Sequence, residues 1–209
     1  MATSKTLGES LREHGVSRRG FLKFCAATAS MMALPPTMAT AIAAALEKAR
    51  RPSVIWLSFQ ECTGCIESLT RSHSPTVENL ILDVVSLDYQ HTLQVASGEL
   101  AEEARLQAMR ENHGSYLVIV DGSLPGPGSN MGYSTVAGHS NLDILLETVE
   151  GAAAVIAVGT CAAFGGLPRA HPNPTGAVAV QDIITNKPVI NVSDCPPIPT
   201  VISGVLAQF

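Results

Sequence analysis

The sequence predicts an α/β protein whose parallel sheet is covered by helices on both faces. Five short runs of apolar and β-branched residues are continuous rather than alternating, which is typical of strands buried on both faces. Helical patterns separate these runs, as expected of βαβ units. The chain of 209 residues is 46% hydrophobic and 15% charged, so it is apolar enough to bury such a sheet.

The expected strands and helices alternate along the chain from residue 53 onward. The expected strands are Ser53–Phe59, Leu80–Leu87, Tyr116–Val120, Ala152–Val158 and Pro188–Val192. The expected helices run from Thr63 or Gly64 to about Ser72, then Glu99–Glu111, Asn141–Glu150 and Pro199–Phe209. The apolar positions of the second helix, Leu100, Ala104 and Ala108, are expected on one face. Ligands of such sheets bind beyond the carboxyl ends of the strands.

The N-terminus has the pattern of a twin-arginine export signal. Arg18 and Arg19 precede the apolar stretch Phe24–Leu34, which is too short to span a bilayer. Small residues follow, and we expect peptidase cleavage near Ala43 or Ala45. The alternative is an arginine pair before an N-terminal amphipathic helix. The order of basic region, apolar region and small-residue site favours the signal peptide.

We therefore expect residues 1–45 to be a signal peptide and residues 46–209 to be one domain. Twin-arginine substrates cross the membrane folded, so the expected location is the periplasm, with any membrane association made through partners. The signal contains five basic and two acidic residues, so residues 46–209 carry a net charge of −8 against −5 for the whole chain. This acidic domain argues against nucleic acid as a partner.

Four cysteines follow the ends of expected strands. Cys62 and Cys65 come after the first strand, Cys161 after the fourth and Cys195 after the fifth, whereas Cys25 lies in the expected signal peptide. If these strands are neighbours in a parallel sheet, the four sulfurs meet at one edge. Four converging thiolates hold a soft metal centre, either zinc or an iron–sulfur cluster.

Other readings of the cysteines stay open at this point. An exported protein can join them in two disulfides, or bury them as free thiols. The motif Cys62-Thr-Gly-Cys65 also suits a thiol–disulfide oxidoreductase, although that function leaves Cys161 and Cys195 unused. A metal-binding or interaction module without redox chemistry is a further alternative. Asp121 ends the third expected strand. One interpretation places it facing the four cysteines, whereas its position before Gly122 favours a turn aspartate.

With its motifs laid out, the chain resembles the small, electron-transferring subunit of nickel–iron hydrogenases. The likeness extends across the expected mature sequence, in the same order, and the leader also fits. The motifs that carry it are Glu61-Cys-Thr-Gly-Cys65, Gly159-Thr-Cys161 with Gly165-Gly166, Pro172-Asn-Pro-Thr-Gly176 and Cys195-Pro-Pro197.

The resemblance implies a flavodoxin-like domain that carries the proximal [4Fe–4S] cluster on Cys62, Cys65, Cys161 and Cys195. It implies a heterodimer with a large subunit, which holds the Ni–Fe site and without which this chain is not catalytic. Electrons from hydrogen oxidation would pass through the cluster to an acceptor, such as a cytochrome or a membrane quinone-reducing partner. Glu61 becomes a candidate proton relay. The family's further clusters belong to a C-terminal region that we expect this chain to lack.

Overall fold

The computed structural model describes residues 6, 8–9, 13, 15–31, 35, 37–48, 51–128, 131–206 and 208. These residues form two compact units, Met1–Arg51 and Pro52–Phe209. In the first unit, helices α2 (Arg18–Met31) and α3 (Met38–Lys48) enclose a small core of Phe21, Cys25 and Ala43. Residues 32–34 of the predicted apolar stretch lie outside the described residues. None of the described helices combines the length and apolarity needed to cross a bilayer.

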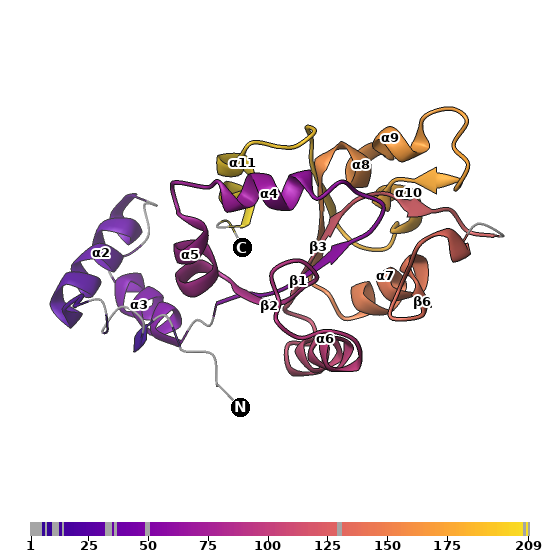
Figure 1. Ribbon diagram of the computed structural model, residues 1–209. Coiled ribbons are helices and arrows are strands. Elements are labelled where there is room, and N and C mark those ends of the chain that lie inside the picture. The colour runs from indigo at the N-terminus through magenta and orange to yellow at the C-terminus, as the bar shows by residue number, and fades with distance from the viewer. Residues whose placement is uncertain are drawn as a thin grey trace. The chain divides into compact units, whose positions relative to one another are not determined.

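The second unit is built on a five-stranded sheet in the order β2-β1-β3-β7-β9. All of its strand pairs are parallel (Figure 1). When only the five strands of this sheet are numbered along the chain, their order is 2-1-3-4-5, as in flavodoxin. The predicted fold class is therefore confirmed. The strands are β1 (Ser53–Ser58), β2 (Ser86–Gln90), β3 (Leu117–Asp121), β7 (Ala154–Val158) and β9 (Val189–Val192).

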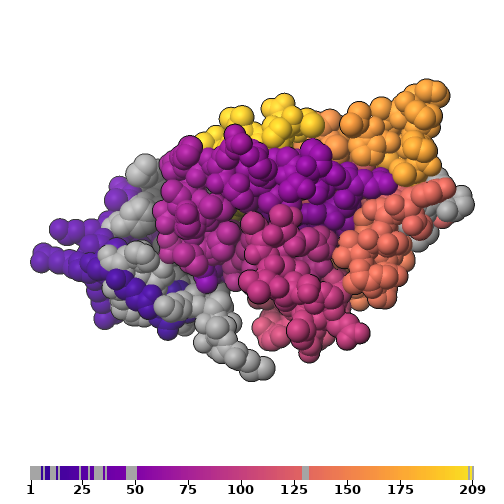
Figure 2. Space-filling view, viewed as in Figure 1, coloured from indigo at the N-terminus to yellow at the C-terminus, as the bar shows by residue number. Residues whose placement is uncertain are grey.

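Helices cover both faces of this sheet and create two apolar cores. Helices α4 (Gly64–Thr70) and α11 (Pro199–Leu206) lie side by side over the face that carries Trp56 and Ile119 (Figure 1). Helices α6 (Glu99–Glu111) and α7 (Asn141–Glu150) contribute to the core on the opposite face, with Ile55, Leu57 and Val118. The bounds of α6 and α7 are those that the sequence predicts. In the space-filling view, the segments from α4 to α6 cover the near side of this unit (Figure 2).

The predicted strand Leu80–Leu87 was wrong. Residues Leu80–Val84 form a single π-helical turn, η1, which continues the short helix α5 (Val77–Asn79), and β2 begins only at Ser86. The Thr76 hydroxyl accepts a hydrogen bond from the Asn79 amide and so caps the start of this helical segment. The edge strand β2 is only partly buried, which explains why its sequence lacks the continuous apolar pattern of the central strands.

Short elements fill the connections between the main strands and helices. Helix α8 (Gly159–Phe164) begins directly after β7. The strands β4 and β8 pair with each other, as do β5 and β6, in two small antiparallel pieces. Ser129 and Asn130 of the nearby Gly- and Pro-rich loop lie outside the described residues. The bounds are β4 (Leu124–Pro125), η2 (Met131–Tyr133), β5 (Thr135–Val136), β6 (His139–Ser140), α9 (Gly166–Arg169), β8 (Ala177–Val178) and α10 (Val180–Ile183).

A buried polar cluster lies between β2, α6 and α7. The Tyr89 hydroxyl donates to Glu102 Oε1 at 2.6 Å and contacts His91 Nε2 at 2.8 Å. Arg105 donates from Nε to Glu102 at 2.9 Å and from Nη2 to Glu147 at 2.7 Å. The face of α6 predicted from its apolar residues was therefore wrong in part. Arg105 is buried beside Ala101 and Ala108, whereas Leu100 is exposed.

Candidate metal centre

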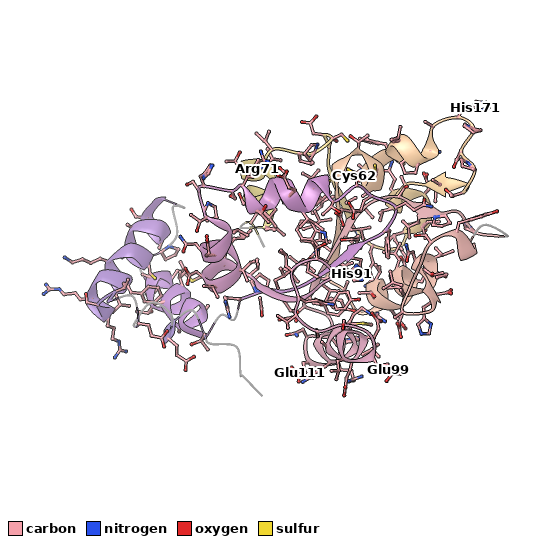
Figure 3. The ribbon with its side chains drawn as sticks, viewed as in Figure 1. Cys62, Arg71, His91, Glu99, Glu111 and His171 are labelled. Atoms are coloured by element: carbon pink, nitrogen blue, oxygen red, sulfur yellow. The ribbon has the colours of Figure 1, made fainter. Side chains whose placement is uncertain are left out.

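The four predicted cysteines line one pocket at the carboxyl ends of β1, β7 and β9. All four are free thiols; Cys62 and Cys195 are exposed, and Cys65 and Cys161 are half-buried. Figure 3 shows Cys62 near the N-terminal end of α4. The remaining residues of the lining are Glu61, Gly64, Gly122, Thr160 and Pro196.

The first cysteine turn is fixed by the start of α4. Thr63 has φ of 66°, a left-handed conformation that reverses the chain before the helix begins at Gly64. One turn on, Ile66 and Leu69 are buried in the core of this face. The Cys65 thiol then points back to the sheet, where its Sγ lies 3.8 Å from the carbonyl oxygen of Val158.

The second turn brings the backbone close to sulfur at two glycines. Gly159 has φ of 85°, and a Cβ placed there would overlap Cys65 Sγ. Gly166 has φ of 51°, and its added Cβ would lie 2.6 Å from Cys161 Sγ. Both contacts favour glycine, because an added Cβ would overlap sulfur, and the positive backbone angles add to this preference. The backbone therefore passes close to two of the four sulfurs.

The third turn is joined to the other two by hydrogen bonds. The Thr160 amide donates to the Asp194 carbonyl at 2.8 Å, which connects the second and third turns. The Ser68 hydroxyl of α4 donates to the Pro197 carbonyl at 2.5 Å. Cys195 is thereby held in place relative to the turns that carry Cys65 and Cys161.

Gln60 anchors the approach to the first turn. Its backbone exchanges two hydrogen bonds with Ser123, at 3.0 and 3.1 Å, and its Oε1 accepts from Thr175 at 3.4 Å. A Cβ added to Gly122, the residue before Ser123, would lie 2.8 to 2.9 Å from backbone atoms of Gln60. The chain before Cys62 is thus packed tightly against the loop that follows β3.

The thiols influence one another electrostatically. Burial is the main cause that raises the pKa of Cys65 to about 12, and the charges of Asp121 and of the three other cysteines contribute to the same shift. Burial also raises the pKa of Cys161, to which Cys195 and Cys62 contribute. Thiols with a raised pKa keep their protons, and a metal centre that binds them as thiolates displaces those protons.

Four thiols around one pocket are a donor set that can hold an iron–sulfur cluster. Among the described residues, no three histidine, cysteine, aspartate or glutamate side chains are arranged to hold one metal ion. A tetrahedral zinc site needs its ligands at one point, with Zn–S distances of about 2.3 Å. In a four-iron cluster with four cysteine ligands, the sulfurs can be spread around the core. The four thiols that line the pocket are compatible with ligands placed around such a core.

Two acidic residues accompany the thiols. Glu61 lines the pocket; its Oε1 accepts from the Thr63 hydroxyl at 3.3 Å, and burial raises its pKa. Asp121 is fully buried rather than placed in an exposed turn, and its Oδ1 accepts from Trp56 Nε1 at 2.9 Å. The preferred interpretation of Asp121 as a turn aspartate did not indicate this burial. The available signal was its position two residues after Ile119, on the same face of a central strand.

The family to which the sequence belongs is identified by comparison with known proteins. Residues 62–209 match the model of the family described as "NADH ubiquinone oxidoreductase, 20 Kd subunit". The match begins at Cys62 and contains all four cysteines of the pocket.

Curated relatives carry the names of hydrogenase subunits. The chain is 45% identical to the Hydrogenase-2 small chain of Escherichia coli (strain K12), across 90% of this chain and 50% of that protein. It is also 45% identical to the periplasmic [NiFe] hydrogenase small subunit 1 of Nitratidesulfovibrio vulgaris, across 96% of this chain and 63% of that protein. The chain thus spans about half to three-fifths of the length of these relatives.

Solved structures agree with the sequence comparison. The [NiFeSe] hydrogenase of Desulfovibrio vulgaris Hildenborough has a TM-score of 0.71 and 36% identity, across 76% of this chain and 59% of that one. The Ni-Fe-Se hydrogenase of Desulfomicrobium baculatum has a TM-score of 0.72 and 32% identity, across 75% of this chain and 61% of that one. The chain belongs to the NADH ubiquinone oxidoreductase 20 Kd subunit family, in which it is similar to the small subunits of nickel–iron hydrogenases.

Proposed function

We propose that this chain is the iron–sulfur electron-transfer subunit of a nickel–iron uptake hydrogenase. Cys62, Cys65, Cys161 and Cys195 would hold one [4Fe–4S] cluster, the proximal one, which carries one electron at a time. A large subunit with the Ni–Fe site would oxidise hydrogen, and an external acceptor, such as a cytochrome or a quinone-reducing membrane partner, would receive the electrons. The observation that carries the proposal is the meeting of four free thiols from three turns in one pocket.

The chain's own residues determine how such a centre would be held. The close approach of Gly159 and Gly166 to sulfur leaves no room for a side chain at either position, beside Cys65 and Cys161. Exclusion of water and hydrogen bonds to sulfur are the means by which a protein sets a cluster potential. Cys62 and Cys195 lie on the open side, where a partner subunit would cover them.

The alternative function as a thiol–disulfide oxidoreductase has less support. An enzyme of that class exchanges disulfides through the two thiols of a Cys-x-x-Cys motif. The motif Cys62-Thr-Gly-Cys65 is also joined here by two further thiols that such an enzyme does not need.

The experiment compares variants of single cysteines. The 209-residue chain is purified anaerobically, its iron, sulfide and zinc are measured, and the reduced protein is studied by electron paramagnetic resonance. We expect about four irons and four sulfides per chain. Cys161→Ser should lose most of this content, whereas Cys25→Ser, which changes a buried cysteine of the first unit, should keep it. Stoichiometric zinc in the purified chain, or the same iron and sulfide content in both variants, contradicts the proposal.

Export and proton transfer require separate tests. We infer that residues 1–45 direct folded export to the periplasm, so replacing Arg18 and Arg19 together by lysine should leave the protein in the cytoplasm with its cluster intact. We infer that Glu61, which lines the pocket, relays protons. In the complex with a large subunit, Glu61→Gln should slow hydrogen oxidation severalfold without loss of iron. Unchanged turnover would exclude the relay.

A further inference from the structure

A buried carboxylate lies behind the cysteine pocket. Asp121 is the last residue of β3, the central strand, and is 0% exposed. Trp56 on the neighbouring strand β1 donates from Nε1 to Asp121 Oδ1 at 2.9 Å. The other oxygen, Oδ2, has no hydrogen-bond partner among the described residues. The carboxylate is therefore only partly compensated by hydrogen bonds.

The position of Asp121 directs its charge toward the thiols. Side chains alternate along a strand, so Asp121 lies on the same face of β3 as Ile119, the face that α4 covers. The first turn of α4 carries Cys65, and the next residue of the loop, Gly122, lines the pocket. Asp121 also pairs in register with Val158 of β7, the residue whose carbonyl oxygen lies 3.8 Å from Cys65 Sγ.

We propose that Asp121 lowers the reduction potential of the cluster held by the four cysteines, and that Trp56 limits this effect by hydrogen bonding. The inference rests on the proposed function. Reduction adds one electron to the cluster, and no bond forms or breaks. With four thiolates, a [4Fe–4S]²⁺ core has a net charge of −2, which becomes −3. A buried negative charge opposes this step, because charges interact more strongly in a protein interior than in water.

The test is a redox titration of the anaerobic 209-residue chain with dithionite, followed by electron paramagnetic resonance. Asp121→Asn keeps the shape of the side chain and removes its charge. We expect the reduction equilibrium to shift about tenfold toward the reduced cluster, which is about 59 mV for one electron. Asp143→Asn makes the same charge change in an exposed first turn of α7 and should leave the potential unchanged.

Trp56→Phe provides a second and opposite test. It removes the indole donor, so the carboxylate charge is less compensated. In a titration at pH 8.5, well above the pKa of about 6 to which burial raises Asp121, the potential should become more negative. If Asp121→Asn keeps its iron and sulfide but does not move the potential, the inference is wrong while the proposed function stands. If Asp121→Asn does not fold, the absence of a negative shift in Trp56→Phe overturns the inference. A wild-type chain without iron and sulfide overturns both.

Discussion

The Sγ of Cys65 occupies the space in which a side chain of residue 159 would begin, so these two positions constrain each other across two different turns of the chain. Gly159 follows β7, and Cys65 belongs to the first turn of α4. The thiol can point into the pocket only because the backbone after β7 carries no Cβ. The candidate site thus depends on residues that supply no ligand.

Gly159→Ala should therefore abolish the site. A non-glycine residue at φ of 85° costs about 1–2 kcal/mol, and the new methyl group must also displace the Cys65 thiol. We expect a lower melting temperature and loss of most of the bound iron, measured by calorimetry and metal analysis. Gly204→Ala is the matched control, because a Cβ at that helical position in α11 meets nothing within 4 Å. Full iron content in Gly159→Ala would contradict this account.

The hydrogen bond between Ser68 and Pro197 should hold the third cysteine turn in place. Ser68→Ala leaves the buried Pro197 carbonyl without its donor, which costs about 1–3 kcal/mol. We expect iron to be lost to a chelator severalfold faster than from the wild type. Thr70→Ala on the same helix removes an exposed hydroxyl that donates to the Glu67 carbonyl, and should change little. Equal rates in the two variants would show that this bond does not stabilise the site.

Arg105→Met should strongly destabilise the second unit. The Arg105 side chain is 4% exposed and pairs with Glu102 and Glu147. Removing one member of a fully buried ion pair costs about 3–5 kcal/mol. Here Glu147 is 52% exposed and stays solvated, whereas Glu102 is 15% exposed, so we expect a loss near the lower end of that range. Arg71→Met breaks an exposed pair with Glu67 and should cost less than about 1 kcal/mol. Urea unfolding of both variants measures the difference, and similar midpoints would refute the prediction.

His91 should make the protein less stable in mild acid. Burial lowers the pKa of His91. The negative charge of Glu102 raises this pKa, and the positive charge of Arg105 lowers it. The unfolded chain therefore binds a proton more readily than the folded one. Stability should be constant above the unfolded pKa of about 6.5 and should fall as the pH drops below it. Protonation would also place a hydrogen on Nδ1, which now accepts from the Ser58 amide at 3.4 Å.

The check is thermal unfolding at pH 7.5 and pH 5.5. His91→Gln removes the titrating group, so the loss of melting temperature between these two conditions should shrink. His171→Gln, in an exposed loop, should behave as the wild type. If the loss persists in His91→Gln, other groups are responsible for it.

Much of the sheet could be predicted from the sequence, because its central strands have a uniform environment. Both faces of these strands are buried, as Val118 and Ile156 show, and a continuous apolar run in the sequence indicates such a strand. The edge strand β2 has one open side and a mixed pattern, so its predicted position was wrong. The four cysteines were predicted to meet because parallel strands place their ends at one edge.

Buried charges were the part that the sequence could not indicate. Arg105 resembles any surface residue of an amphipathic helix until Glu102, Glu147 and Thr148 are seen around it. Asp121 precedes a glycine, as turn aspartates do, and only the pairing of β1 with β3 places it beside Trp56. Such environments arise from contacts between segments far apart in the chain, and no local pattern records them.

The order of strands in the sheet has a consequence for assembly. The cysteine turns follow the first, fourth and fifth strands along the chain, and β9 is added at the end of the sheet, next to β7. A nascent chain therefore presents only an incomplete set of thiols until its last strand has docked. If the four thiols hold one cluster as proposed, the complete cluster can form only after β9 has joined the sheet, because Cys195 follows that strand.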